Sequence, residues 1–123
     1  MPRRVLVVED DERSRRLLTD VLAWHGYEVE AAESGEEALR ATALRPADAA
    51  LLDFQLPGMD GFAVLAALRS RGGRLPAIAV TASVMDSDRV RILAAGFDAC
   101  LGKPVNIREL AATLQSLLAE VAP

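Results

Sequence analysis

The chain has 123 residues, a length that suits one domain with a substantial hydrophobic core. Hydrophobic residues make up 51% of it, which excludes a disordered chain, and a net charge of −4 without a basic stripe argues against nucleic acid as a partner. The single cysteine, Cys100, excludes an internal disulfide and suits a reducing compartment. No run approaches the ~20 apolar residues of a membrane span, and no signal peptide opens the chain. We therefore expect one cytoplasmic domain over residues 1–123, with no membrane partner.

The first elements alternate between strand and helix patterns. Val5–Val8 is a wholly apolar run rich in β-branched residues, which predicts a strand buried on both faces. A helix is predicted from about Glu12 to its end at Gly26. Its apolar face is expected to carry Leu17, Leu18, Val21 and Leu22. Residues 27–31 then alternate apolar and acidic side chains, which predicts an edge strand with one side in water.

The later elements continue the alternation. A helix over residues 36–45, ended by Pro46, precedes a buried strand over 48–52. Further strands are predicted at 77–80 and 99–101, and further helices at 62–71, 88–95 and 107–121. Strict alternation implies a parallel sheet with helices on both faces and right-handed crossovers. Ligands of such sheets bind beyond the carboxyl ends of the strands, so the strand-end residues are the candidates for a functional site.

Polar side chains stand at the predicted strand ends. They are Glu9 and Asp10 after the first strand, Asp53 at the third, Thr81 at the fourth and Lys103 after the fifth. If the first and third strands are neighbours, three carboxylates lie about 5 Å apart, and their mutual repulsion calls for a cation. Oxygen ligands without a nearby His or Cys favour a hard ion, Mg²⁺ above all, with Mn²⁺ as a possible substitute. The cluster therefore predicts phosphoryl chemistry.

Each of these residues also has an ordinary structural interpretation. Asp10 or Asp11 suits the N-cap of the first helix, Thr81 suits a cap after the fourth strand, and Asp53 suits a turn. Their convergence on one edge of the sheet is what favours a functional site. Lys103 supports it independently, because the chain has thirteen Arg and this one Lys. A compact ammonium contacts a carboxylate or phosphoryl oxygen as a point charge, which a guanidinium fork does not.

Four blocks of the sequence resemble the signature of response-regulator receiver domains. They stand in the family's order and spacing at Val5–Asp11, Leu52–Gly61, Val80–Ala82 and Gly102–Pro104. The resemblance covers essentially the whole chain. It implies a flavodoxin-like, doubly wound α/β fold, whose five-stranded parallel sheet has the order 2-1-3-4-5 with helices on both faces.

The resemblance also implies a phosphoacceptor and a metal site. Asp53 would be the phosphoacceptor, and it would share Mg²⁺ with Asp10 and the backbone carbonyl of Gln55. The longer Glu9 side chain suits an outer-sphere position better than direct coordination. Gln55 would in addition flank the site of water attack and tune the lifetime of the acyl phosphate.

The remaining implied roles concern the response to phosphorylation. Thr81 and Lys103 would engage the phosphoryl group, and the Lys103–Pro104 peptide bond would be cis. Ser83, two residues after Thr81, would tune the acyl-phosphate lifetime. The family usually carries an aromatic switch residue three positions before the lysine, where this chain has Cys100. We interpret Cys100 as a small buried strand residue, with a redox role as the lesser alternative.

The implied partners are a phosphodonor and an output protein. The donor would be a histidine kinase or a histidine phosphotransfer protein, because His25, the only histidine, suits the dipole at the end of the first helix instead. Output would pass through the face formed by the fourth helix, fifth strand and fifth helix, from a monomer or a weak dimer that forms on phosphorylation. We expect a stand-alone single-domain regulator, with a receiver module of a hybrid sensor histidine kinase as the alternative.

Three other functions compete with a receiver. A Mg²⁺-dependent phosphatase that forms an aspartyl phosphate needs a general acid two residues after the nucleophile, where Gln55 cannot serve. A nucleotide-binding flavodoxin-like domain lacks its Gly-rich loop after the first strand. A degenerate receiver that serves only for binding disagrees with the full set of site residues. We therefore expect a phosphorylated switch that assists only its own phosphoryl transfer and dephosphorylation.

Overall fold

A computed structural model describes residues 2–56, 58–72, 74–82 and 85–121. Strands and helices alternate along it as β1 (Arg4–Val8), α1 (Glu12–Trp24), β2 (Glu28–Ala32), α2 (Gly35–Ala41), β3 (Ala49–Asp53), α3 (Gly61–Arg69), β4 (Ala77–Thr81), α4 (Asp86–Ala94), β5 (Ala99–Gly102) and α5 (Ile107–Val121). The strands pair in parallel in the order β2-β1-β3-β4-β5, which confirms the predicted fold and strand order. Across these ranges, no helix has the length and apolarity needed to cross a membrane.

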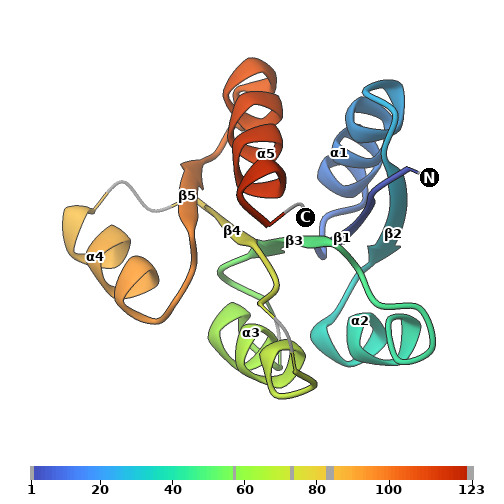
Figure 1. Cartoon of the computed structure of the whole chain (residues 1–123). Helices are drawn as coiled ribbons and strands as arrows, with labels where there is room; N and C mark the ends of the chain where they lie inside the picture. Colours follow the sequence, from blue (N-terminus) through green and yellow to red (C-terminus); the bar gives the residue numbers. More distant parts are fainter. Residues whose placement is uncertain (1, 57, 73, 83–84, 122–123) are drawn as a thin grey trace.

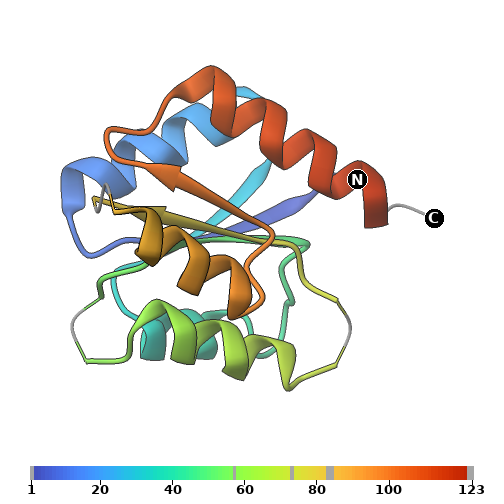
Figure 2. The same cartoon turned by 90° about the vertical axis from the view of Figure 1, so that its left-hand side faces the viewer.

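The sheet separates two helical layers. Figures 1 and 2 show α1 and α5 on one face, and α2, α3 and α4 on the other. Successive side chains of a strand point to opposite faces, so each buried strand supplies both cores. The core under α1 and α5 includes Val5, Val7, Leu22, Leu51, Ile78, Leu110 and Leu114. The core over α2, α3 and α4 includes Leu6, Val8, Leu52, Val64, Leu65, Leu68 and Ile92.

Side chains at the helix starts satisfy the first free backbone N–H groups. Asp11 accepts from the Ser14 N–H at 2.9 Å, which makes Asp11 the N-cap of α1 and leaves the Asp10 carboxylate out of the cap. Ser34, Asp60 and Asn106 cap α2, α3 and α5 in the same way. At its other end, α1 ends at Trp24 with His25 as its C-cap, because Gly26 then has φ +93°, a conformation that suits glycine.

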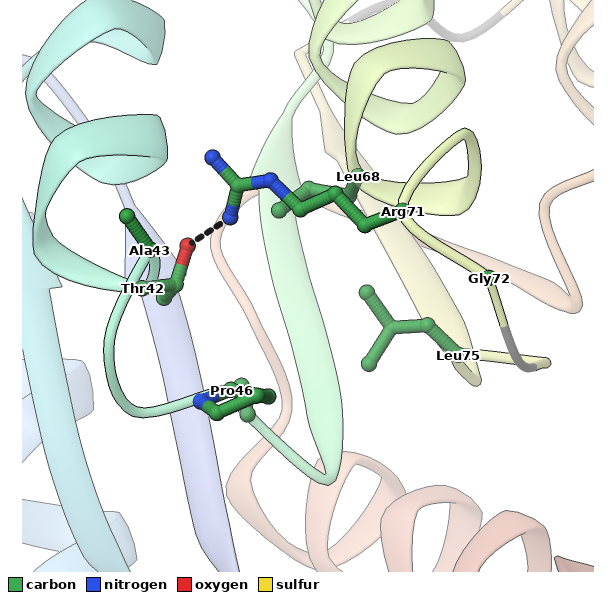
Figure 3. A pocket seen from close by; sticks show the side chains of 8 residues that line it. Thr42, Ala43, Pro46, Leu68, Arg71, Gly72 and Leu75 are labelled. Carbon is green, nitrogen blue, oxygen red and sulfur yellow. Dashed lines mark hydrogen bonds between the residues drawn. The ribbon is translucent and has the colours of Figure 1, made fainter.

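Helix α2 is shorter than predicted, because it ends at Ala41 and not at residue 45. The Leu39 carbonyl, which would accept from the N–H of residue 43 in a longer helix, accepts from the Arg71 guanidinium at 2.6 Å. Arg71 also donates to the Thr42 hydroxyl at 2.8 Å (Figure 3). Thr42 and Arg71 border a hollow of about 410 Å³ between the ends of α2 and α3. This hollow lies at the amino ends of β3 and β4, away from the strand-end carboxylates.

The apolar face of α1 is narrower than predicted. Leu18 and Leu22 are buried, whereas Leu17 is 56% exposed and Val21 is half-buried. Successive residues of a helix are about 100° apart, so Leu17 points away from the sheet when Leu18 faces it. The other element bounds differ little: α4 begins two residues earlier than predicted, and β3, β4 and β5 each extend one residue further.

This difference within α1 gives a matched pair of substitutions. Leu22→Ala should lower the free energy of unfolding by about 2–5 kcal/mol, because it leaves a cavity in the core. Leu17→Ala should change it by less than about 0.5 kcal/mol, since most of that side chain is already in water. Urea unfolding followed by circular dichroism measures both. Equal losses in the two variants would contradict the assignment of the buried face.

Candidate functional site

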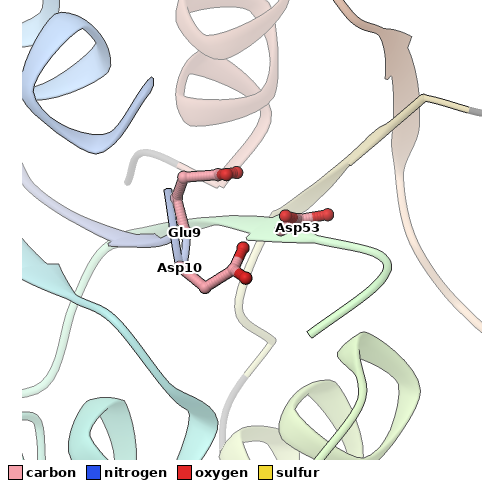
Figure 4. A group of neighbouring side chains, drawn as sticks. All are labelled: Glu9, Asp10 and Asp53. Atoms are coloured by element: carbon pink, nitrogen blue, oxygen red, sulfur yellow. The ribbon is translucent and has the colours of Figure 1, made fainter. Parts of the chain in front are cut away.

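The strand register brings the predicted site residues to one edge of the sheet. Val8 pairs with Leu52 across β1 and β3, so Glu9 and Asp53 follow at neighbouring positions. Asp53 in turn pairs with Val80, directly before Thr81. Thr81 pairs with Gly102, and the Thr81 carbonyl accepts from the Lys103 backbone N–H at 2.8 Å. Figure 4 shows the carboxylates of Glu9, Asp10 and Asp53 gathered where β1 and β3 end.

Lys103 links two of the buried carboxylates. Its Nζ lies 3.1 Å from Asp53 Oδ2 and 3.1 Å from Glu9 Oε2, and it donates to Glu9 Oε1 at 3.2 Å. Glu9 is only 1% exposed and Asp53 5%, so neither carboxylate is well hydrated. An ammonium between them supplies the charge compensation that burial makes necessary.

The shifted pKa values reflect this environment. Burial raises the pKa of the Glu9 carboxyl; the hydrogen bond from Lys103 opposes the rise, and the negative charge of Asp53 adds to it. Burial also works against the charge on Lys103, but its hydrogen bonds to Glu9 and Asp53 outweigh that effect, so the pKa of Lys103 lies above its usual value. The Glu9 carboxyl is thus shifted mainly by burial, and the Lys103 ammonium by its two carboxylate partners.

The acidic cluster fits a divalent cation. One carboxylate oxygen from each of Glu9, Asp10 and Asp53 lies within 4.8 Å of the others. Asp10 is exposed, and within the described ranges its carboxylate forms no hydrogen bond or ion pair, so it is available as a ligand. A set of oxygen donors suits a hard ion such as Mg²⁺. Glu9, by contrast, is already engaged by Lys103 and by the Asp11 N–H at 3.3 Å, in keeping with the outer-sphere position predicted for it.

The residues around Asp53 hold its carboxylate in place. The Gln55 N–H donates to Asp53 Oδ1 at 3.0 Å, so the two carboxylate oxygens have different partners. Phe54, between them, continues the sheet by donating its N–H to the Val80 carbonyl at 2.9 Å. The Gln55 residue is exposed. Ser83, the second predicted tuning residue, lies outside the described residues.

Three other predicted residues surround this centre. Thr81 is 1% exposed at the end of β4. The Lys103–Pro104 peptide bond is cis, as predicted. Cys100 is half-buried on β5, beside Ala79 of β4, and packs against the core over α2, α3 and α4. Cys100 therefore lies on a strand, as we interpreted it, but it is half-buried and not fully buried; partial burial raises the pKa of its thiol.

Two features of the site were missed by the sequence analysis. Arg15 of α1 donates to the carbonyls of Glu9 at 3.0 Å and Asp10 at 3.4 Å, and so braces the acidic loop. An arginine four residues after an N-cap aspartate was the available signal. The second feature is a hollow of about 130 Å³ beside the lysine, lined by Glu9, Ser14, Leu17, Leu18, Val80, Lys103, Pro104 and Val105. No local pattern could have indicated it, because its walls come from three distant segments.

The predicted structural role of the single histidine agrees with its position. His25 follows the last turn of α1, and its Nδ1 lies 2.9 Å from the Val21 carbonyl oxygen. It stands at the carboxyl end of α1, whereas the acidic cluster lies at the amino end. His25 is therefore outside the site.

Comparison with known proteins identifies the family. The model of the response regulator receiver domain matches residues 5–115, and the chain belongs to this family. It is thus a receiver domain of two-component signalling, a family whose members act as signalling switches and interact with histidine kinases and downstream effectors.

Individual relatives agree with this assignment. The chain is 43% identical to the response regulator MprA of Mycobacterium sp. (strain KMS) over 123 residues, which is all of this chain and 54% of that protein. A putative response regulator from Chloroflexus aurantiacus J-10-fl is 35% identical with a TM-score of 0.87, over 97% of this chain and 99% of that one. The signal receiver domain of a signal transduction histidine kinase from Syntrophus aciditrophicus is 32% identical with a TM-score of 0.85, over 96% and 91%. The chain spans about half the length of the curated relatives it matches.

Removing the ammonium tests the electrostatic balance of the site. Lys103→Met should destabilise the metal-free protein by up to about 3 kcal/mol at pH 8, because Glu9 and Asp53 then face each other without a cation. The loss should shrink toward pH 5. The pKa of Glu9 is already raised and would rise further, so the carboxyl takes up a proton in the folded state as the pH falls. Urea unfolding in EDTA at both pH values measures this, with the exposed Arg108→Met as control. A loss independent of pH would contradict the prediction.

The thiol of Cys100 offers a separate test. Because burial raises its pKa, only a small fraction is thiolate near pH 8, and the side chain is half-covered. Iodoacetamide should therefore alkylate the folded protein several-fold more slowly than the same chain in urea, as followed by intact mass. Equal rates would favour a reactive, redox-type cysteine.

Proposed function

We propose that Asp53 accepts a phosphoryl group from a phosphohistidine of a partner protein, and that the aspartyl phosphate switches a protein-binding face. The observation that carries this proposal is the convergence of the Glu9, Asp10 and Asp53 carboxylates with the Lys103 ammonium at one edge of the sheet. Structural ion pairs alone do not require a third, exposed carboxylate beside them. Such a constellation suits phosphoryl transfer, which depends mainly on positioning and charge compensation.

The chemical step is an in-line displacement by a carboxylate. A carboxylate oxygen of Asp53 forms a bond to phosphorus while the P–N bond to the donor imidazole breaks, and the bonding electron pair stays on the ring nitrogen. Hydrogen bonds from Gln55 N–H and Lys103 Nζ orient the attacking carboxylate before the donor arrives. Lys103 then stabilises negative charge on the transferred oxygens.

Mg²⁺, or Mn²⁺ in its place, is the proposed cofactor. Asp10, Asp53 and the Gln55 backbone carbonyl would hold it, with Glu9 in the outer sphere. When bound, the ion offsets the charge of the phosphoryl oxygens. The cluster of oxygen donors and the unpaired Asp10 carboxylate support this assignment.

The output is proposed to pass through α4, β5 and α5. The new phosphoryl oxygens engage Lys103 and the Thr81 hydroxyl, and so bias the segment that follows β4. Helix α4 follows this segment and exposes the apolar side chains of Val90 and Leu93, which suits a protein contact. Ser83 is proposed to tune the lifetime of the acyl phosphate, and Cys100 replaces the usual aromatic switch residue. The species proposed are a monomer and a weak dimer that forms on phosphorylation.

The wider architecture stays a prediction, because the chain spans only about half of its MprA relatives. We favour a stand-alone regulator that binds protein and not nucleic acid. The likeness to a receiver domain of a histidine kinase from Syntrophus aciditrophicus supports the alternative of a hybrid-kinase module.

Phosphorylation of the isolated chain tests the proposed function. With acetyl phosphate and Mg²⁺, intact mass should increase by one phosphoryl group, and beryllofluoride should shift the amide NMR signals around Asp53. Asp53→Asn should abolish both effects, and EDTA or Asp10→Asn should weaken them strongly, because the acceptor or its cation is lost. A response of Asp53→Asn equal to wild type would contradict the proposal. Sustained hydrolysis of small phosphate esters would instead favour the phosphatase.

A further inference from the structure

The first turn of α3 packs directly against the phosphoacceptor segment. Gly61, the first residue of that helix, has so little space that a Cβ there would lie 3.0 Å from the Asp53 carbonyl oxygen and 3.2 Å from the Phe54 Cα. Both neighbours are backbone atoms, which cannot rotate away as a side chain can. The Gly61 N–H also donates to the Phe54 carbonyl at 3.4 Å.

The next residue of α3 holds the same segment through its side chain. The Phe62 ring contacts the Phe54 ring edge-on, with centroids 4.9 Å apart and an angle of 87° between the planes. Phe62 is itself held by Phe97, at 6.2 Å between centroids, and by the Arg91 guanidinium, 5.8 Å from the ring centroid. Phe54 is thus fixed by its backbone against Gly61 and by its ring against Phe62.

We infer that Gly61 and Phe62 are positioning residues for the phosphoryl-transfer site, and that the first turn of α3 sets the position of the Asp53–Gln55 segment. Hydrogen bonds tie this segment to β4, α3 and Lys103: Phe54 N–H donates to the Val80 carbonyl, Gly61 N–H to the Phe54 carbonyl, and Lys103 Nζ to Asp53 Oδ2. Within the segment, the Gln55 N–H donates to Asp53 Oδ1 and so couples the carboxylate to the Gln55 backbone. A shift of the Asp53–Phe54 peptide by a few tenths of an ångström therefore moves the carboxylate and the Gln55 backbone together.

This role explains why glycine stands at the start of α3. Alanine is the better helix former by roughly 1 kcal/mol, and Asp60 already supplies the N-cap. Gly61 does not have a left-handed backbone, so its conformation does not require glycine. The close contact with the Asp53–Phe54 peptide requires glycine, because it leaves too little space for a Cβ atom. The inference rests on the proposed function, since it concerns the geometry of the proposed acceptor and metal ligands.

A second glycine provides a matched control. Gly35 is the first residue of α2, follows the N-cap Ser34, and has even less space, because a Cβ there would lie 2.5 Å from Val64 Cγ2. Its close neighbours are side-chain atoms of Val64 and Met59, not the backbone of the acceptor segment. Gly35→Ala should therefore cost stability without changing how the folded protein binds metal. Leu22→Ala serves in the same way for Phe62→Leu, because Leu22 is buried in the core under α1 and α5, on the opposite face of the sheet from Phe62.

The test compares the four variants with wild type in two measurements. The dissociation constant for Mn²⁺ alone is measured by electron paramagnetic resonance, and the rate of phosphorylation by acetyl phosphate by intact mass, both at a temperature where each variant is folded by circular dichroism. Gly61→Ala should weaken Mn²⁺ binding about tenfold, as expected when a residue that orients a ligand is changed, and should slow phosphorylation. Phe62→Leu should act in the same direction. Gly35→Ala and Leu22→Ala should lower only the melting temperature.

The outcomes separate the inference from the proposed function. If wild type neither binds Mn²⁺ nor becomes phosphorylated, the proposed function fails. If wild type does both, while Gly61→Ala and Phe62→Leu match their controls, the positioning role of α3 is wrong. Should Gly61→Ala not fold, the comparison of Phe62→Leu with Leu22→Ala decides alone, since Phe62→Leu introduces no backbone clash.

Discussion

Burial of β1, β3 and β4 on both faces is the constraint on which the rest of the structure depends. Every residue of these strands is buried, so a polar side chain can reach a ligand only where a strand ends. Parallel pairing places those ends at one edge, and the order β2-β1-β3-β4-β5 puts β1, β3 and β4 side by side there. The acidic cluster is thus a consequence of the sheet, which concentrates charge that no single strand could carry alone.

The Lys103 ammonium offsets the repulsion between the carboxylates gathered at this edge. Two buried carboxylates beside each other would repel and favour protonation, and the raised pKa of Glu9 shows that burial acts in this direction. The ammonium bonds both carboxylates and leaves Asp10 exposed at the rim. Even with Lys103 and the Arg15 guanidinium beside them, the three carboxylates leave this edge with a net negative charge. Such an edge suits a divalent cation. A phosphoryl group on Asp53 would then add negative charge where carboxylates and cations already offset one another.

Much of the fold and of the proposed site could be predicted from the sequence, and the failures have local physical causes. Apolar runs and glycine stops located the strands and helices to within a few residues, and the family blocks placed Asp53 and Lys103. The early end of α2 could not be predicted, because the Leu39 carbonyl is taken by Arg71, 32 residues away. The exposure of Leu17 could not either, since three further apolar residues near it on α1 made several faces equally plausible.

The sequence by itself determined the alternation of strands and helices, the strand-end position of each polar residue, and membership of the receiver family. Those properties follow from short-range patterns, such as the period of apolar residues and the spacing of the motif blocks. Only the tertiary structure decided which oxygens Lys103 contacts, how Arg15 braces the acidic loop, and how closely Gly61 approaches the Asp53–Phe54 peptide. Contacts of this kind join segments far apart in the chain, and their distances depend on how the helices pack on the sheet.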